Sequence, residues 1–75
     1  MRTISQKQFN ELQERLEFNG ADSVFFAKLQ HLTGITAHLY IGYTLYDEDG
    51  NYLCDSEDID LNYMLRDAGI DIKKE

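Results

Sequence analysis

The chain is organised around ITAHLYIGYTLYDEDGNYLCD, residues 35–55. Between Ile35 and Tyr46, apolar side chains alternate with more polar ones. This period of two is typical of a β-strand with one face against a core. An Asp-Glu-Asp-Gly turn follows, and residues 51–55 return the chain. The stretch therefore predicts an antiparallel β-hairpin whose first arm covers residues 35–46.

The register of this hairpin depends on Gly50. A type I turn with Gly50 at the positive φ of a G1 bulge pairs Tyr46 with Tyr52 and Leu45 with Leu53. A four-residue loop without the bulge would mix the two faces, because a slip of one residue turns every side chain over. We therefore expect the bulged turn. The outer face then carries His38, Tyr40, Tyr46, Tyr52 and Cys54.

Two helices are expected before the hairpin. The first covers residues 6–18, where Ser5 can form a capping box. The second covers residues 23–33, with Asp22 as its N-cap and Gly34 as the left-handed residue that ends it. Their phenylalanines recur at helical spacing and are assigned to the core: Phe9, Phe18, Phe25 and Phe26.

A third helix is expected after the hairpin, with Asp60 as its N-cap and Gly69 as the residue that ends it. Residues 70–72 alternate and leave open a third short strand at the C-terminus. The prediction is a single compact α+β domain over residues 1–75, with two N-terminal helices, an antiparallel hairpin and one C-terminal helix in the order ααββα.

Size and cysteine content limit the class of protein. A chain of 75 residues buries only roughly 60% of its unfolded surface, which leaves no room for a deep cleft. Its one cysteine excludes an internal disulfide framework and favours a reducing compartment. No apolar run approaches the ~20 residues of a membrane span, and the N-terminus lacks the apolar centre of a signal peptide. We expect a cytoplasmic protein that does not bind membranes.

The net charge of −7 is unevenly distributed. Residues 1–46 carry four basic and four acidic side chains, whereas residues 47–75 carry ten acidic and three basic ones. Residues 47–60 alone hold seven carboxylates and no base. Such a field repels phosphate and attracts cationic surfaces. It argues against direct nucleic-acid binding and for a partner with a basic surface.

No motif indicates a cofactor, a metal or a catalytic centre. If Gly50 took position six of a calcium-binding EF-hand loop, position one would be Leu45, which has no oxygen ligand. Cys54 shows no metal-like spacing to His31 or His38. Along one long strand, His38 and Cys54 would lie ~20 Å apart, at roughly 3.3 Å per residue. We therefore expect that the chain is not an enzyme.

The tyrosines and carboxylates of the hairpin can be explained in two ways. Tyrosines suit strands and shelter one another, and acidic residues suit a solvated turn and the start of a helix. Alternatively, a rigid aromatic patch beside an acidic rim is a protein-binding surface. On the second interpretation the partner-binding residues are Tyr40, Tyr46, Asp47, Glu48, Asp49, Tyr52, Asp55, Glu57, Asp58 and Asp60.

Three functions are compatible with these patterns. The first, which charge and size favour, is an acidic interaction module that inhibits or modulates a nuclease or other nucleic-acid enzyme, as phage-type nucleic-acid mimics do. The second is a regulatory module, because two helices before a hairpin resemble a winged helix-turn-helix. Its second helix has only Lys28 and its wing tip is acidic, so DNA binding of its own is not expected. The third is an obligate homo-oligomer, for example a homodimer.

Overall fold

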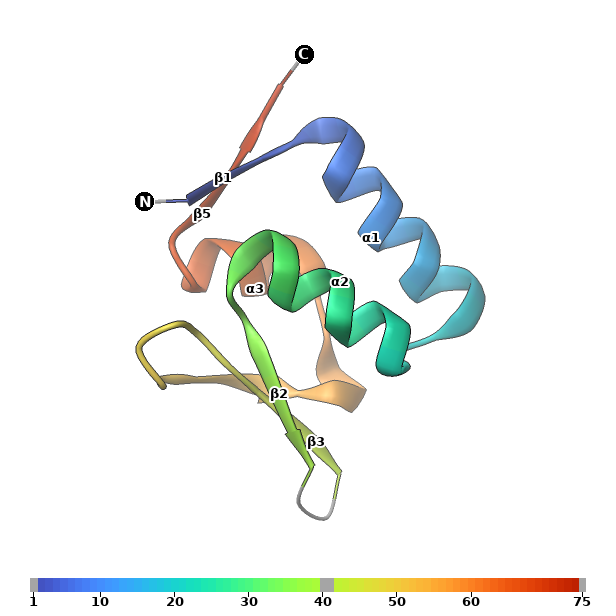
Figure 1. Ribbon diagram of the computed structural model, residues 1–75, viewed down its shortest axis with the longest axis vertical. Helices are drawn as coiled ribbons and strands as arrows, with labels where there is room; N and C mark the ends of the chain where they lie inside the picture. Colours follow the sequence, from blue (N-terminus) through green and yellow to red (C-terminus); the bar gives the residue numbers. More distant parts are fainter. Residues whose placement is uncertain (1, 40–41, 75) are drawn as a thin grey trace.

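The structure is a computed structural model that describes residues 2–39 and 42–74. In chain order its elements are β1 (Arg2–Ser5), α1 (Gln6–Asn19), α2 (Ser23–Thr33), β2 (Thr36–Leu39), β3 (Tyr43–Tyr46), β4 (Tyr52–Asp55), the short 3-10 helix η1 (Ser56–Asp58), α3 (Leu61–Asp67) and β5 (Ile70–Lys73) (Figure 1). The mixed α+β class is confirmed. The order ααββα is only roughly right, because it lacks β1 and counts one strand where β2 and β3 stand.

Strands β2, β3 and β4 form an antiparallel meander, and the single arm predicted over residues 35–46 is wrong. Within that arm, β2 turns back on β3, with Ala37 opposite Leu45 and Leu39 opposite Tyr43. Three residues separate the two strands. An odd number keeps odd-numbered residues on the same face of both strands. Strands β2 and β3 therefore have the same inward and outward alternation as one long strand, and a period of two cannot distinguish the two arrangements.

The turn between β3 and β4 has the predicted bulged geometry. Gly50 has a φ of +85°. Its backbone N–H donates to the Asp47 carbonyl at 3.1 Å, and the Asp47 N–H donates to the Asn51 carbonyl at 3.0 Å. Tyr46 consequently stands opposite Tyr52, as expected.

One pair further along, the predicted register is wrong. A shift between Leu45 and Tyr46 places Cys54, and not Leu53, opposite Leu45. Cys54 therefore shares the core-facing side of the sheet with Leu45, and its Sγ lies 3.8 Å from the Met64 Sδ. The expectation that Cys54 belongs to the outer face is corrected by this second irregularity.

A second sheet consists of β1 and β5, which run parallel, with Ile4 opposite Ile72. In Figure 1 these two strands lie side by side, away from the meander. The optional C-terminal strand therefore exists, but it pairs with the start of the chain and not with the hairpin. Strand β1 was not predicted, because Arg-Thr-Ile-Ser contains one apolar residue and its partner lies at the other end of the chain.

The helices begin where the capping residues predict. The Ser5 Oγ accepts the Gln8 N–H at 3.0 Å, and the Gln8 Oε1 accepts the Ser5 N–H at 2.8 Å. Asp22 and Asp60 each accept the backbone N–H three residues later, at 2.8 and 3.2 Å. Gly34 ends α2 in the left-handed conformation. These local signals orient the helices that support the meander.

The core draws on both sheets and on all three helices. Phe18 is an exception to the prediction, since its side chain is 78% exposed. It follows Leu16 by two residues, which turns it by about 200° from the buried stripe of α1. Tyr43 faces the core, with its ring centroid 4.6 Å from that of Phe26. The buried residues are Ile4, Phe9, Leu12, Phe25, Phe26, Leu29, Ile35, Leu45, Leu61, Met64, Leu65 and Ile70.

Candidate functional site

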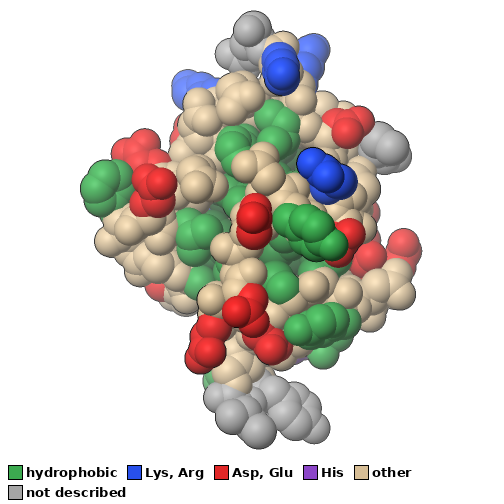
Figure 2. All heavy atoms as spheres, turned by 180° about the vertical axis from the view of Figure 1, so that it is seen from behind, with side chains coloured by type: hydrophobic (Ala, Val, Ile, Leu, Met, Phe, Trp, Pro, Cys, Tyr) green, Lys and Arg blue, Asp and Glu red, His purple; other side chains and the backbone are tan. Residues whose placement is uncertain are grey.

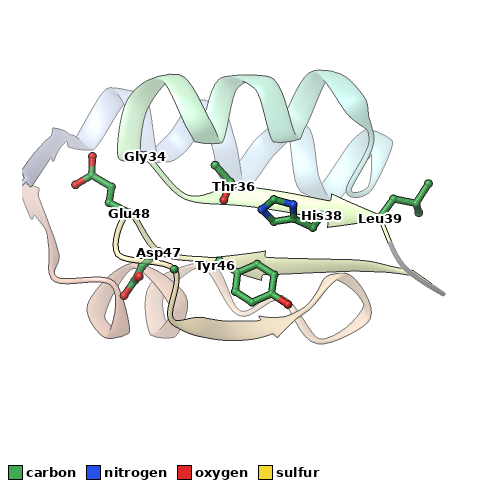
Figure 3. Close-up of a pocket in the computed structure, with 8 residues that line it drawn as sticks. Gly34, Thr36, His38, Leu39, Tyr46, Asp47 and Glu48 are labelled. Carbon is green, nitrogen blue, oxygen red and sulfur yellow. The ribbon is translucent and has the colours of Figure 1, made fainter.

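The outer face of the meander carries an aromatic row, which we call the aromatic ladder and define as His38, Tyr46 and Tyr52. The ring centroid of Tyr46 lies 5.2 Å from that of His38 and 6.3 Å from that of Tyr52, with interplanar angles of 74° and 76°. His38 is exposed, Tyr46 is half-buried and Tyr52 is 58% exposed. In Figure 3 the His38 and Tyr46 rings stand in front of their strands. The ladder is thus an accessible surface with a fixed geometry.

Two turns bring these three rings together. The bulged turn at Gly50 places Tyr52 directly opposite Tyr46. The antiparallel pairing of β2 with β3 places His38 opposite Thr44, so that His38 is the diagonal neighbour of Tyr46. Aromatic side chains interact over both the direct and the diagonal spacing. The site therefore depends on a turn that the period-two pattern concealed.

Beside the ladder lies an open hollow with a volume of about 610 Å³. Strand β2 forms one wall, and the end of β3 with the following turn forms the other (Figure 3). Leu39, which is 67% exposed, stands at one end, and Glu48 stands at the other. The lining residues are Gly34, Thr36, His38, Leu39, Tyr46, Asp47, Glu48 and Gly50.

Asp47 is part of the turn itself. Its Oδ1 accepts the backbone N–H groups of Asp49 and Asn51, both at 2.9 Å, and its Oδ2 accepts the Asn51 side-chain amide at 3.2 Å. The hydrogen bond from the Asn51 backbone is the main cause that lowers the pKa of Asp47. Because both carboxylate oxygens are engaged, Asp47 shapes the turn more than it presents charge.

Glu48 and Asp60 also have partners within the chain. The Glu48 Oε1 lies 2.7 Å from the Arg2 Nη2, and the side chain of Glu48 passes over Gly34. The Arg2 and Glu48 side chains are 45% and 52% exposed, so this ion pair is a solvated one. Asp60 caps α3. Two more of the predicted partner-binding carboxylates therefore have structural roles.

The remaining four carboxylates form what we call the acidic rim: Asp49, Asp55, Glu57 and Asp58. All four are exposed. Asp55 lies on β4 with Tyr52 and stands opposite Thr44, which is also the partner of His38, so Asp55 is on the same face as the ladder. Partial desolvation of Tyr52 and the nearby charges of Asp55 and Asp58 raise the pKa of Tyr52. Within residues 2–39 and 42–74, Asp49, Glu57 and Asp58 have no hydrogen-bonded or ion-pair partner for their carboxylates.

The charge map is sharper than the division expected from the sequence. Residues 29–65, which contain the whole meander, η1 and most of α3, carry seven acidic side chains and no lysine or arginine. The other residues carry seven acidic and seven basic side chains, so the net −7 arises entirely from this segment. In Figure 2 the visible basic side chains lie in the upper half, whereas the lower half shows acidic side chains among hydrophobic ones.

The residues on the outer face differ in part from those predicted. Tyr40 lies outside the described residues. His38, which the sequence placed on the outer face but not among the binding residues, joins the ladder. His38 and Cys54 lie on opposite faces, so the estimate of ~20 Å along one strand started from a wrong arrangement. Burial first, and then the charges of Asp55 and Asp58, raise the pKa of Cys54 and favour its thiol form.

No protein-family model matches this chain, and no curated protein and no solved structure is significantly similar to it. Across the described part of the chain, no three or more His, Cys, Asp or Glu side chains are grouped so that they could hold a metal ion. The described helices include none that is long and apolar enough to cross a bilayer. The ladder, the hollow and the rim are therefore the features that bear on function.

Proposed function

We propose that this chain is a small acidic interaction module that binds a basic surface of another protein and thereby inhibits or modulates a nucleic-acid enzyme. One observation carries the proposal: the aromatic ladder and the acidic rim belong to the same 37-residue segment, residues 29–65, which holds seven carboxylates and no basic side chain. It acts by binding and not by catalysis.

The two parts of this surface supply different components of binding. Tyrosines that are fixed by ring contacts provide contact area at a low cost in conformational entropy, as anchors of protein interfaces do. Exposed carboxylates accelerate encounter with a positive surface and weaken association as salt rises. A partner that evolved to bind phosphate presents such a positive surface. The module would occupy it and compete with nucleic acid.

Self-association through this face is less favourable. Two copies that met ladder to ladder would bring two segments of charge −7 together, and like charges opposed across an interface are costly. We therefore favour a different protein as the partner over a second copy of this chain.

The proposal is tested with two charge-matched triple variants as baits in cell extract. The rim variant is Asp49→Asn, Glu57→Gln and Asp58→Asn. The control changes three exposed carboxylates of α1, as Glu11→Gln, Glu14→Gln and Glu17→Gln. Each variant raises the net charge from −7 by three, to −4. Neither touches Asp47, Glu48 or Asp60, which serve the fold.

At low salt, the wild type and the control should retain a basic protein that the rim variant loses, and high salt should release it. The recovered protein is then assayed for binding or cleavage of nucleic acid, which added wild-type module should inhibit. If the rim variant and the control retain the same proteins at both salt concentrations, the rim serves only solvation and the proposal is wrong.

A further inference from the structure

The ladder presents ring faces as well as ring edges. Adjacent rings of His38, Tyr46 and Tyr52 are inclined by 74° and 76°, so the edge of one ring meets the face of the next. The outermost ring, that of Tyr52, is 58% exposed. Exposed π-faces attract cations that approach within about 6 Å of the ring centroid.

Charge decides which kind of group can occupy this surface. Asp55 lies on β4 with Tyr52, Asp58 follows in η1, and Glu48 stands at the far end of the hollow. Residues 29–65 contribute no competing cation. Nucleic-acid bases also stack on aromatic side chains, but their phosphates require a basic groove, which this segment lacks. The face is complementary to an organic cation.

Arginine fits this combination better than lysine. Its guanidinium is planar, weakly hydrated and able to stack on a ring while its N–H groups donate to a carboxylate. The ammonium of lysine is compact and strongly hydrated. At one end of the hollow, the Glu48 Oε1 already lies 2.7 Å from the guanidinium Nη2 of Arg2. Glu48 has a second oxygen with which it can accept another donor.

Resting on the proposed function, we propose that the partner contributes an extended, arginine-bearing segment that lies across the outer face of the meander. Its guanidinium groups stack on Tyr46 and Tyr52 and enter the hollow beside His38. The carboxylates of Asp55, Asp58 and Glu48 provide the opposite charge. In this arrangement the ladder distinguishes arginine from other cations, whereas the acidic rim attracts any cation.

The test uses two fluorescein-labelled probes of equal length, a peptide of alternating glycine and arginine and one of alternating glycine and lysine. Fluorescence anisotropy gives their affinities for the wild type, Tyr52→Leu, Tyr46→Leu and the control Phe18→Leu. Phe18 is an exposed aromatic residue on α1, outside the meander. Tyr52 is exposed, so Tyr52→Leu should keep the fold even if the half-buried Tyr46 does not tolerate replacement.

The arginine peptide should bind the wild type more tightly than the lysine peptide, and loss of one stacked guanidinium in Tyr52→Leu should weaken the arginine peptide by roughly 2- to 5-fold. This preference should disappear in both tyrosine variants and persist in Phe18→Leu. Equal affinity for the two peptides, or a preference that survives Tyr52→Leu, overturns the arginine assignment. The proposed function would still stand if the rim variant lost its partner in the extract.

A labelled single-stranded oligonucleotide serves as the third probe. It should not bind at physiological salt. Binding that Tyr52→Leu abolishes would overturn the arginine assignment, because the ladder would then be a platform for bases. Failure of both peptides to bind at low salt also overturns it. The capture experiment with the rim variant decides the proposed function separately from all of these outcomes.

Discussion

Replacement of Gly34 by alanine should disturb the hollow through a single side chain. Gly34 ends α2 with a φ of +78°, and a Cβ built on it would lie 2.6 Å from the Glu48 Cδ and nearer still to the Cγ. Glu48 must therefore swing away, and its ion pair with Arg2 is lost. Gly69, with a φ of +76°, has no atom within 4 Å of the corresponding Cβ position and provides the control.

The expected magnitude has two parts. Left-handed backbone costs an L-residue about 1–2 kcal/mol, and this part is common to Gly34→Ala and Gly69→Ala. Displacement of Glu48 adds the loss of an exposed ion pair, about 0–1 kcal/mol. Gly34→Ala should thus lower the free energy of unfolding by about 1–3 kcal/mol in total. Each kcal/mol lowers the Tm of a domain of this size by about 4–8 °C.

Urea unfolding followed by circular dichroism measures both substitutions in the wild type and in a Glu48→Ala background. Removal of Glu48 should bring the cost of Gly34→Ala down to that of Gly69→Ala, because only backbone strain remains. If Gly34→Ala costs more than Gly69→Ala and this excess persists in the Glu48→Ala background, Glu48 does not lie over Gly34. The wall assigned to the hollow would then be wrong.

Two further predictions concern the turn that positions the ladder. Gly50→Val should lower the free energy of unfolding by at least about 1–2 kcal/mol, because Gly50 has a φ of +85° and no neighbour within 4 Å, so strain alone acts; an unchanged urea midpoint would contradict the bulged turn. Asp47→Asn should be less stable than wild type near neutral pH. The ordinary pKa of an aspartate is 3.8, and the pKa of Asp47 in the folded protein is lower. The difference in stability should therefore shrink as the pH falls below 3.8 and through this lower pKa. Unfolding curves between about pH 6 and 3 check this, and a constant difference would show that the carboxylate charge does not stabilise the turn.

The helices were predictable because each is specified by neighbours in the sequence. Ser5 and Gln8 cap one another, and Asp22 and Asp60 cap amides three residues away. The bulged turn was predictable for the same reason, since Gly50 alone supplies its positive φ. At these positions the deciding contact is local, and the residue type is sufficient to identify it.

The errors arose where the deciding contact is distant or where two arrangements share one pattern. The meander keeps the alternation of one long strand. Gly42 was the one residue in the sequence that indicated a break between β2 and β3. Strand β1 and strand β5 recognise each other from opposite ends of the chain. Neither arrangement can be separated from its alternative by periodicity.

The roles of the carboxylates were predictable only where their partners are close in the sequence. Asp47 had a signal, because an aspartate that opens a turn commonly accepts backbone N–H groups from the residues that follow. Glu48 had none, since its partner Arg2 lies on a strand that the sequence did not predict. Tyr46 and Tyr52 were placed on the outer face through Gly50, whereas His38 could join them only once β2 had turned back.

What the fold does not use is the strongest argument about function. Three of the seven carboxylates in residues 29–65 serve the structure, as a turn former, an ion-pair partner and a helix cap. Within the described residues, Asp49, Glu57 and Asp58 have no such partner, and like charges gathered on one surface oppose folding in a domain whose core is small. Tyr52 contacts Tyr46 across the sheet, yet it remains 58% exposed. Repulsive charge and an exposed aromatic side chain in one segment support the proposal that this surface binds a cationic partner.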